Sequence, residues 1–146
     1  MTVRSVEEPH EAECESKLRK YGFILTYGVT SPNVKVAGAN EYPVGVTLQP
    51  TKKFDGTITS SVRVAYAKTG LVKIFKRAGV ASILQGDGVT SDASGCATRF
   101  PATKFAAQSF CAQPYRSLVG IAEERIATAA SGLFKVYLTI HTTPKP

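Results

Sequence analysis

The segment Phe134-Lys135-Val136-Tyr137-Leu138-Thr139-Ile140-His141 has the clearest structural pattern in this 146-residue chain, because its apolar and polar residues alternate one by one. Such a period of two predicts a β-strand with one buried and one solvated face. Residues 58–66 show the same alternation: Ile58, Val62, Val64 and Tyr66 face one way, and Thr59, Arg63 and Ala65 the other.

Shorter alternating stretches occur at residues 23–27, 34–36 and 44–48, and Gly and Pro residues separate them. Short strands divided by turn residues are typical of sandwiches and barrels. We therefore predict a mainly β fold, a small β-sandwich or barrel with at most one or two short helices. The candidates for helical turns are Ile121–Ala130, rich in Ala and Glu, and Phe100–Phe110, which follows Pro101.

Residues 1–20 differ in composition from the rest of the chain. Five of the eleven acidic side chains lie in the first fifteen residues, and a basic cluster of Lys17, Arg19 and Lys20 follows. A short helix from Glu11 to Tyr21 is conceivable, but so short a segment is marginal by itself in water. The prediction is a flexible, extended N-terminal arm over residues 1–20 and a single β-rich domain over residues 21–146.

Two similar units occur in the predicted domain. Pro43-Val44-Gly45-Val46-Thr47-Leu48 precedes a turn-rich gap and an alternating strand, and Leu118-Val119-Gly120-Ile121-Ala122-Glu123 precedes another such gap and strand. A glycine within a strand marks a bulge or a close approach of the backbone. Gly45 and Gly120 are therefore predicted to occupy the same kind of structural corner.

Between the two units lies the segment from Gln85 to Gly95, which reads G-D-x-V-x-x-D-x-x-G from Gly86 onward. Asp caps turns through its own backbone, and Gly accepts a positive φ. Gly86, Asp87, Asp92 and Gly95 are therefore predicted to form two tight turns around a short extended piece.

This order of features resembles the head decoration (capsid cement) proteins of tailed bacteriophages: an early V-G-V strand, the central G-D-x-V-x-x-D-x-x-G segment, a late V-G-I-A and a final alternating strand. The resemblance covers residues 40–141. It implies a small β-rich structural protein of the virion, commonly a homotrimer. Such proteins lie on the exterior of the phage head and hold neighbouring copies of the major capsid protein together.

Within this reading, Arg4, Lys17, Arg19 and Lys20 of the arm are the candidate capsid-binding residues. The chain has no apolar segment typical of a secretory signal or a membrane span, so we expect synthesis in the host cytoplasm and no membrane partner.

No motif indicates catalysis, a metal or a cofactor. Cys14, Cys96 and Cys111 have no C-x-x-C spacing and are expected to be free thiols. Asp87 and Asp92 lack the ligand pattern of a calcium loop. The sequence therefore predicts a protein without enzymatic activity and without cofactors.

Single-stranded nucleic acid is the main alternative partner. The net charge is +7, and residues 16–146 hold 17 of the 18 Lys and Arg residues. Basic and aromatic residues interleave at Lys52-Lys53-Phe54, Lys73-Ile74-Phe75-Lys76-Arg77 and Lys104-Phe105, as in single-strand binders. The same spacing also fits strands with one wet face, which makes nucleic acid the less favoured partner. A third option is another virion component, of the tail or of head completion.

Overall fold

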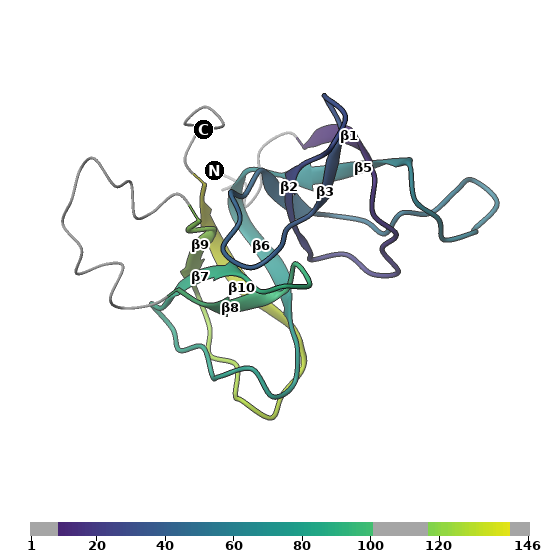
Figure 1. The fold of residues 1–146 in the computed structure, drawn as a ribbon. Coiled ribbons are helices and arrows are strands. Elements are labelled where there is room, and N and C mark those ends of the chain that lie inside the picture. The colour runs from purple at the N-terminus through teal and green to yellow at the C-terminus, as the bar shows by residue number, and fades with distance from the viewer. Residues whose placement is uncertain (1–8, 101–116, 141–146) are drawn as a thin grey trace, which may run out of the picture.

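The computed structural model describes residues 9–100 and 117–140, which contain ten strands and no helix (Figure 1). Five strands form a closed barrel: β1 (His10–Cys14), β2 (Ile24–Tyr27), β3 (Val34–Val36), β4 (Gly45–Thr47) and β5 (Val62–Ala67). The other five form a second sheet: β6 (Thr69–Lys76), β7 (Gly88–Ser91), β8 (Ala97–Arg99), β9 (Gly120–Ala122) and β10 (Gly132–Thr139). The predicted mainly β fold is thus confirmed.

The barrel has the strand order β1-β3-β2-β4-β5 and closes through antiparallel pairing of β1 with β5. The pairing of Ala12 with Val64 lies at the middle of this seam, and both side chains are buried. Closure leaves the barrel without a free strand edge. Its interior is filled by Ala12, Cys14, Leu18, Leu25, Val34, Val44, Val64 and Tyr66.

The second sheet has the order β6-β10-β9-β7-β8, and its longest pairing runs along β6 and β10 from Gly132↔Lys76 to Thr139↔Thr69. The alternation predicted for β10 is confirmed. Phe134, Val136 and Leu138 are buried, whereas their neighbours Lys135 and Tyr137 are exposed. β10 therefore has one face in the core and one in solvent, whereas all four residues of β7 in the same sheet are buried.

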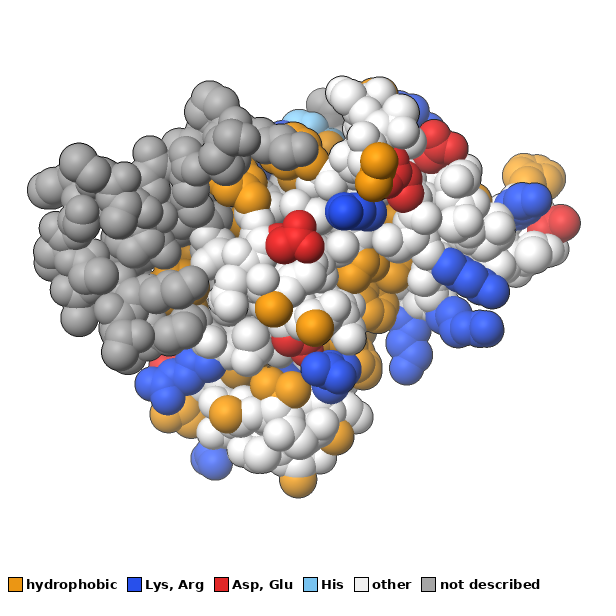
Figure 2. Space-filling model, viewed as in Figure 1, with side chains coloured by type: hydrophobic (Ala, Val, Ile, Leu, Met, Phe, Trp, Pro, Cys, Tyr) orange, Lys and Arg blue, Asp and Glu red, His pale blue; other side chains and the backbone are white. Residues whose placement is uncertain are grey.

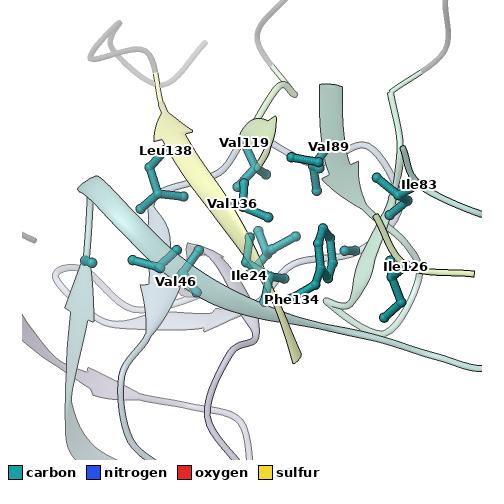
Figure 3. Packing of buried hydrophobic residues seen from close by; sticks show 14 of the residues in the cluster. Ile24, Val46, Ile83, Val89, Val119, Ile126, Phe134, Val136 and Leu138 are labelled. Carbon is teal, nitrogen blue, oxygen red and sulfur yellow. The ribbon is translucent and has the colours of Figure 1, made fainter. Parts of the chain in front are cut away.

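A single hydrophobic core joins the barrel to the second sheet. Ile24 and Leu25 are consecutive in β2 and both fully buried, because Leu25 points into the barrel and Ile24 points out of it, toward the second sheet. In Figure 3, Ile24 and Val46 of the barrel lie next to Phe134 and Val136 of β10. The N–H of Ile24 also donates a 2.8 Å hydrogen bond to the carbonyl of Gly95, in the turn between β7 and β8.

The structure corrects the predicted boundary of the arm at residue 20. His10–Cys14 is a barrel strand, and Leu18 is buried behind it. The strand follows the period of two, since Ala12 and Cys14 point inward and Glu11 and Glu13 point outward. This also rules out the helix considered from Glu11 to Tyr21. Residues 1–8 lie outside the described part of the chain.

The expected helix over Ile121–Ala130 is wrong as well. Residues 120–122 form β9, and Ile126 makes an isolated bridge to Ile83, with backbone hydrogen bonds of 2.9 and 3.0 Å in the two directions. Burial of Ile126 against Ile83 outweighs the favourable helix propensity of the Ala-rich sequence, because propensity contributes only a few tenths of a kcal/mol per residue, about 0–0.7. Of the Phe100–Phe110 candidate, residues 101–110 lie outside the described residues. Residues 9–100 and 117–140 also contain no helix long and apolar enough to cross a bilayer.

The two repeated sequence units form equivalent strand pairs. β4 pairs with β5 and β9 pairs with β10, both antiparallel, and a glycine is the first residue of each three-residue strand. An added Cβ at Gly45 would contact the Tyr66 ring and lie 2.7 Å from the carbonyl oxygen of Ala67. At Gly120 it would contact the carbonyl oxygen of Tyr137. Each glycine thus permits a close approach to the neighbouring strand.

Candidate interaction surface

A positively charged groove lies where the barrel meets the second sheet. Its basic side chains, Lys17, Arg19 and Lys20, come from the loop that follows β1, and all three are exposed. The remaining lining residues are Ser16, Leu18, Phe23, Val36, Phe75 and Ser94, and the groove has a volume of about 540 Å³. None of these lining residues, all from the described part of the chain, is acidic. We call this feature the basic groove.

The floor of the basic groove is aromatic and ordered. The Phe23 and Phe75 rings lie 6.2 Å apart between centroids with their planes at 26°. Lys20 Nζ stands 5.2 Å from the centroid of Phe75, a cation–π distance. The groove therefore combines an apolar base with a positive edge. Figure 2 shows Lys and Arg side chains gathered along the lower edge of the barrel, beside a hydrophobic patch.

The loop with the basic residues is held in place by a buried threonine. The N–H of Leu18 donates to Thr51 Oγ1 at 2.7 Å, and the N–H of Thr51 donates to the carbonyl of Leu18 at 2.9 Å. Both side chains are buried. Since Thr51 begins a hairpin between β4 and β5, this contact joins the basic groove to the hairpin.

That hairpin, residues 51–59, projects from the barrel (Figure 1). Its tip is a turn in which the N–H of Gly56 donates to the carbonyl of Lys53 at 2.9 Å, and Gly56 has a φ of +93°. Asp55 Oδ1 accepts a 2.9 Å hydrogen bond from the N–H of Thr57. At the tip, the Phe54 side chain is fully exposed at 111%.

The predicted central turns are present, and the carboxylates of their aspartates accept hydrogen bonds from backbone N–H groups. Asp87 Oδ2 accepts from the N–H of Leu84 at 2.8 Å, and Asp92 Oδ1 accepts from the N–H groups of Ser94 and Cys96 at 2.8 and 3.0 Å. Gly86 and Gly95 have φ values of +90° and +77°. These residues therefore shape the β7–β8 region, and the second turn reaches the basic groove through Ser94.

The structure places the predicted site residues in separate parts of the fold. Lys17, Arg19 and Lys20 lie together at the basic groove, whereas Arg4 lies outside the described residues. Gly45 lies in the barrel and Gly120 in the second sheet, so these two glycines form no common site.

The described cysteines are free and buried. Burial raises the pKa of the Cys14 thiol, and burial with the neighbouring charge of Asp92 raises the pKa of Cys96 to about 11. Both are therefore protonated at neutral pH and poor nucleophiles. Within residues 9–100 and 117–140, no group of three or more His, Cys, Asp or Glu side chains is arranged to hold a metal ion.

Sequence reasoning missed the buried side chain of Lys76. Its Nζ donates to the carbonyls of Arg77, Thr128 and Ala130 at 3.0, 3.3 and 3.1 Å. Burial lowers the pKa of this ammonium group, and the three carbonyls supply the acceptors it needs. Lys76 therefore connects the loops at the end of the second sheet through these hydrogen bonds. Its side chain is not available to bind nucleic acid.

Glu15 is a second missed residue, and it orders the loop between β2 and β3. Its carboxylate accepts hydrogen bonds from the N–H groups of Thr30 and Val29 at 3.0 and 2.8 Å and from Asn33 Nδ2 at 3.3 Å. These donors, the Thr30 N–H first, hold the pKa of Glu15 below its ordinary value of 4.5.

A pH-dependent contribution of Glu15 to stability follows. Because the pKa is lowered in the folded state, the stabilisation is complete above about pH 4.5 and disappears as the pH falls through the folded-state pKa. Urea unfolding should show Glu15→Gln to be less stable than wild type at pH 7, with a smaller difference near pH 3. Glu123→Gln, at an exposed loop carboxylate, is the control for the assay. A difference for Glu15→Gln that stays constant down to pH 3 contradicts this role.

Comparison with known proteins gives a similarity of fold but none of sequence family. No protein-family model and no curated protein matches the sequence. The fold, however, is similar to that in "The crystal structure of head fiber gp8.5 N base in bacteriophage phi29". The likeness is structural. The TM-score is 0.58 at 17% sequence identity, over 94% of this chain and 98% of the phage chain. The overall fold of this chain is therefore similar to that of the head fiber base over nearly the full length of both chains.

Proposed function

We propose that this protein is a non-enzymatic decoration protein of a tailed-phage head, which binds the outer surface of the major capsid protein lattice and stabilises the head. The observation that carries the proposal is the fold shared with the head fiber base over nearly the full length of both chains. The order of glycine corners and central turns, which resembles the decoration family, supports it independently.

The architecture is suited to such a role. A closed barrel fused to a second sheet through one core gives a rigid body, and rigid bodies lose little conformational entropy on binding. Assembly as a homotrimer, as the family resemblance implies, would let one surface engage several equivalent capsid sites at once and raise avidity.

Within this proposal, the basic groove is the contact surface for an acidic segment of the capsid protein. Lys17, Arg19 and Lys20 supply positive charge, and Phe23 and Phe75 supply an apolar base. Charge complementarity of this kind speeds association and selects the partner.

The test is binding to preformed heads that lack the protein. Wild type should sediment with these heads in a fixed ratio, and the triple variant Lys17→Glu, Arg19→Glu, Lys20→Glu should bind about tenfold more weakly or worse. The control, Lys68→Glu, Arg125→Glu, Lys135→Glu, makes the same change in net charge away from the groove and should bind like wild type.

Two results would contradict these assignments. Wild type that fails to sediment with the heads at any ratio overturns the decoration function. Equal losses in the groove variant and in the control overturn the groove as the contact surface and leave only a dependence on overall charge. Thermal unfolding of each variant verifies that the fold is intact, as expected for the exposed groove residues Lys17, Arg19 and Lys20.

A further inference from the structure

Phe54 is the most exposed large hydrophobic side chain in the described part of the protein. Its relative exposure is 111%, against 84% for Val29 and 51% for Tyr137. A phenylalanine exposed to water gains none of the favourable free energy that burial of its ring in an apolar environment provides. Nothing in the fold requires an aromatic residue at this turn position, where polar residues are common.

The hairpin that presents Phe54 is already ordered. The N–H of Lys53 donates to the carbonyl of Thr57 at 2.8 Å, Lys52 forms a bridge with Ile58, and the N–H of Thr59 donates to the carbonyl of Thr51 at 3.0 Å. The positive φ of Gly56 completes a three-residue tip of a common hairpin type. Such preorganisation lowers the entropy lost when the tip is bound.

We propose that hairpin 51–59 is an anchor whose Phe54 ring inserts into an apolar pocket of the partner, with acidic residues at the pocket rim facing Lys52 and Lys53. The proposal rests on the proposed function and names the chemistry of the capsid-protein surface that this chain recognises. Buried aromatic anchors surrounded by polar contacts carry most of the energy of many interfaces.

Charge decides between this partner and a second copy of the chain. The basic groove offers a base of Phe23 and Phe75 on which the Phe54 ring of a second copy could pack, and it is bordered by Lys17, Arg19 and Lys20. The hairpin carries Lys52 and Lys53 against the single acid Asp55, so its net positive charge would meet the three basic residues of the groove, which is unfavourable. An acidic rim on another protein relieves this repulsion.

The packing of the aromatics also favours a protein over single-stranded nucleic acid. A stacking surface needs successive accessible aromatic faces. Phe75, from the other basic-aromatic run in the described residues, is packed against Phe23 and has Lys20 over its ring. Phe54 therefore stands alone at its tip, as expected of a single anchor.

The experiment compares Phe54→Ser with Phe54→Leu and the matched control Val29→Ser in binding to preformed heads. Phe54→Ser should weaken binding about 30-fold, Phe54→Leu should fall between it and wild type, and Val29→Ser should have no effect. All three should keep the melting temperature of wild type, because both side chains are exposed.

The outcomes separate the two proposals. Failure of wild type to bind heads overturns both the decoration function and the anchor. Binding by wild type and Phe54→Ser with equal affinity overturns the anchor alone. Two further measurements test other binding partners. If sedimentation velocity shows that wild type self-associates and Phe54→Ser does not, Phe54 contacts a second copy of the chain. If wild type binds a labelled single-stranded oligonucleotide in a salt-dependent manner and Phe54→Ser does not, Phe54 contacts nucleic acid, and either result overturns the anchor.

Discussion

Replacing Gly120 with alanine is expected to destabilise the protein by about 3 kcal/mol or more. Gly120 is buried at the start of β9, and an alanine Cβ would contact the carbonyl oxygen of Tyr137 and lie 2.8 Å from Val136 Cγ1. The obstacle is backbone of β10, which is held by pairing on both sides and cannot move aside. Urea unfolding followed by circular dichroism measures the loss.

Gly38→Ala is the matched control for this steric argument. The three atoms nearest to an added Cβ there all belong to the side chain of Glu41, which can move aside at the cost of one exposed 2.8 Å hydrogen bond from the Gly38 N–H, so the loss should be about 1 kcal/mol or less. Neither Gly38 nor Gly120 has a positive φ, so backbone strain does not distinguish the two substitutions. Equal stability of Gly120→Ala and wild type would show that β9 and β10 lie farther apart than the structure gives.

Phe134→Ala is expected to cost about 3–5 kcal/mol of unfolding free energy. The Phe134 ring is buried at 1% exposure, in the core shared by the barrel and the second sheet (Figure 3). Its removal leaves a cavity among residues of both sheets, which are fixed by strand pairing and can collapse only in part. Guanidinium unfolding monitored by circular dichroism provides the measurement.

Leu133→Ala tests the alternation itself. Leu133 is the neighbour of Phe134 in β10, but it faces outward and is 37% exposed. Its truncation should cost clearly less than that of Phe134, about 1–2 kcal/mol, because the side chain is only partly buried. Similar losses for Leu133→Ala and Phe134→Ala would mean that β10 does not divide its side chains between core and solvent.

Sequence alternation predicts a strand most clearly when one face of the strand is buried and the other is exposed. β10 has one buried face, so alternation revealed it directly. Alternation at residues 23–27 also predicted β2, but it did not predict that Ile24, Leu25 and Thr26 are buried in a row, because both faces of β2 are covered. β1 was missed because its inward residues, Ala12 and Cys14, are small and its outward residues are acidic, which resembled a polar arm.

The candidate interaction surface was predictable only in part. Composition indicated the cluster of Lys17, Arg19 and Lys20, but the groove beside it needs Phe75 from β6, far away in the sequence. The Asp55-Gly56 pair was a local sign of the hairpin turn. Complete exposure of Phe54, by contrast, follows from the direction in which the hairpin leaves the barrel, and no local pattern encodes that direction.

The junction between barrel and second sheet contains no hinge. Ile24 is embedded in the shared core, and its backbone is bonded to Gly95 in the opposite sheet, so neither half can rotate without breaking that contact and opening the interior. A partner that binds the barrel therefore also fixes the orientation of the second sheet. On a lattice of identical binding sites, the protein would display its second sheets in a pattern as regular as the lattice beneath.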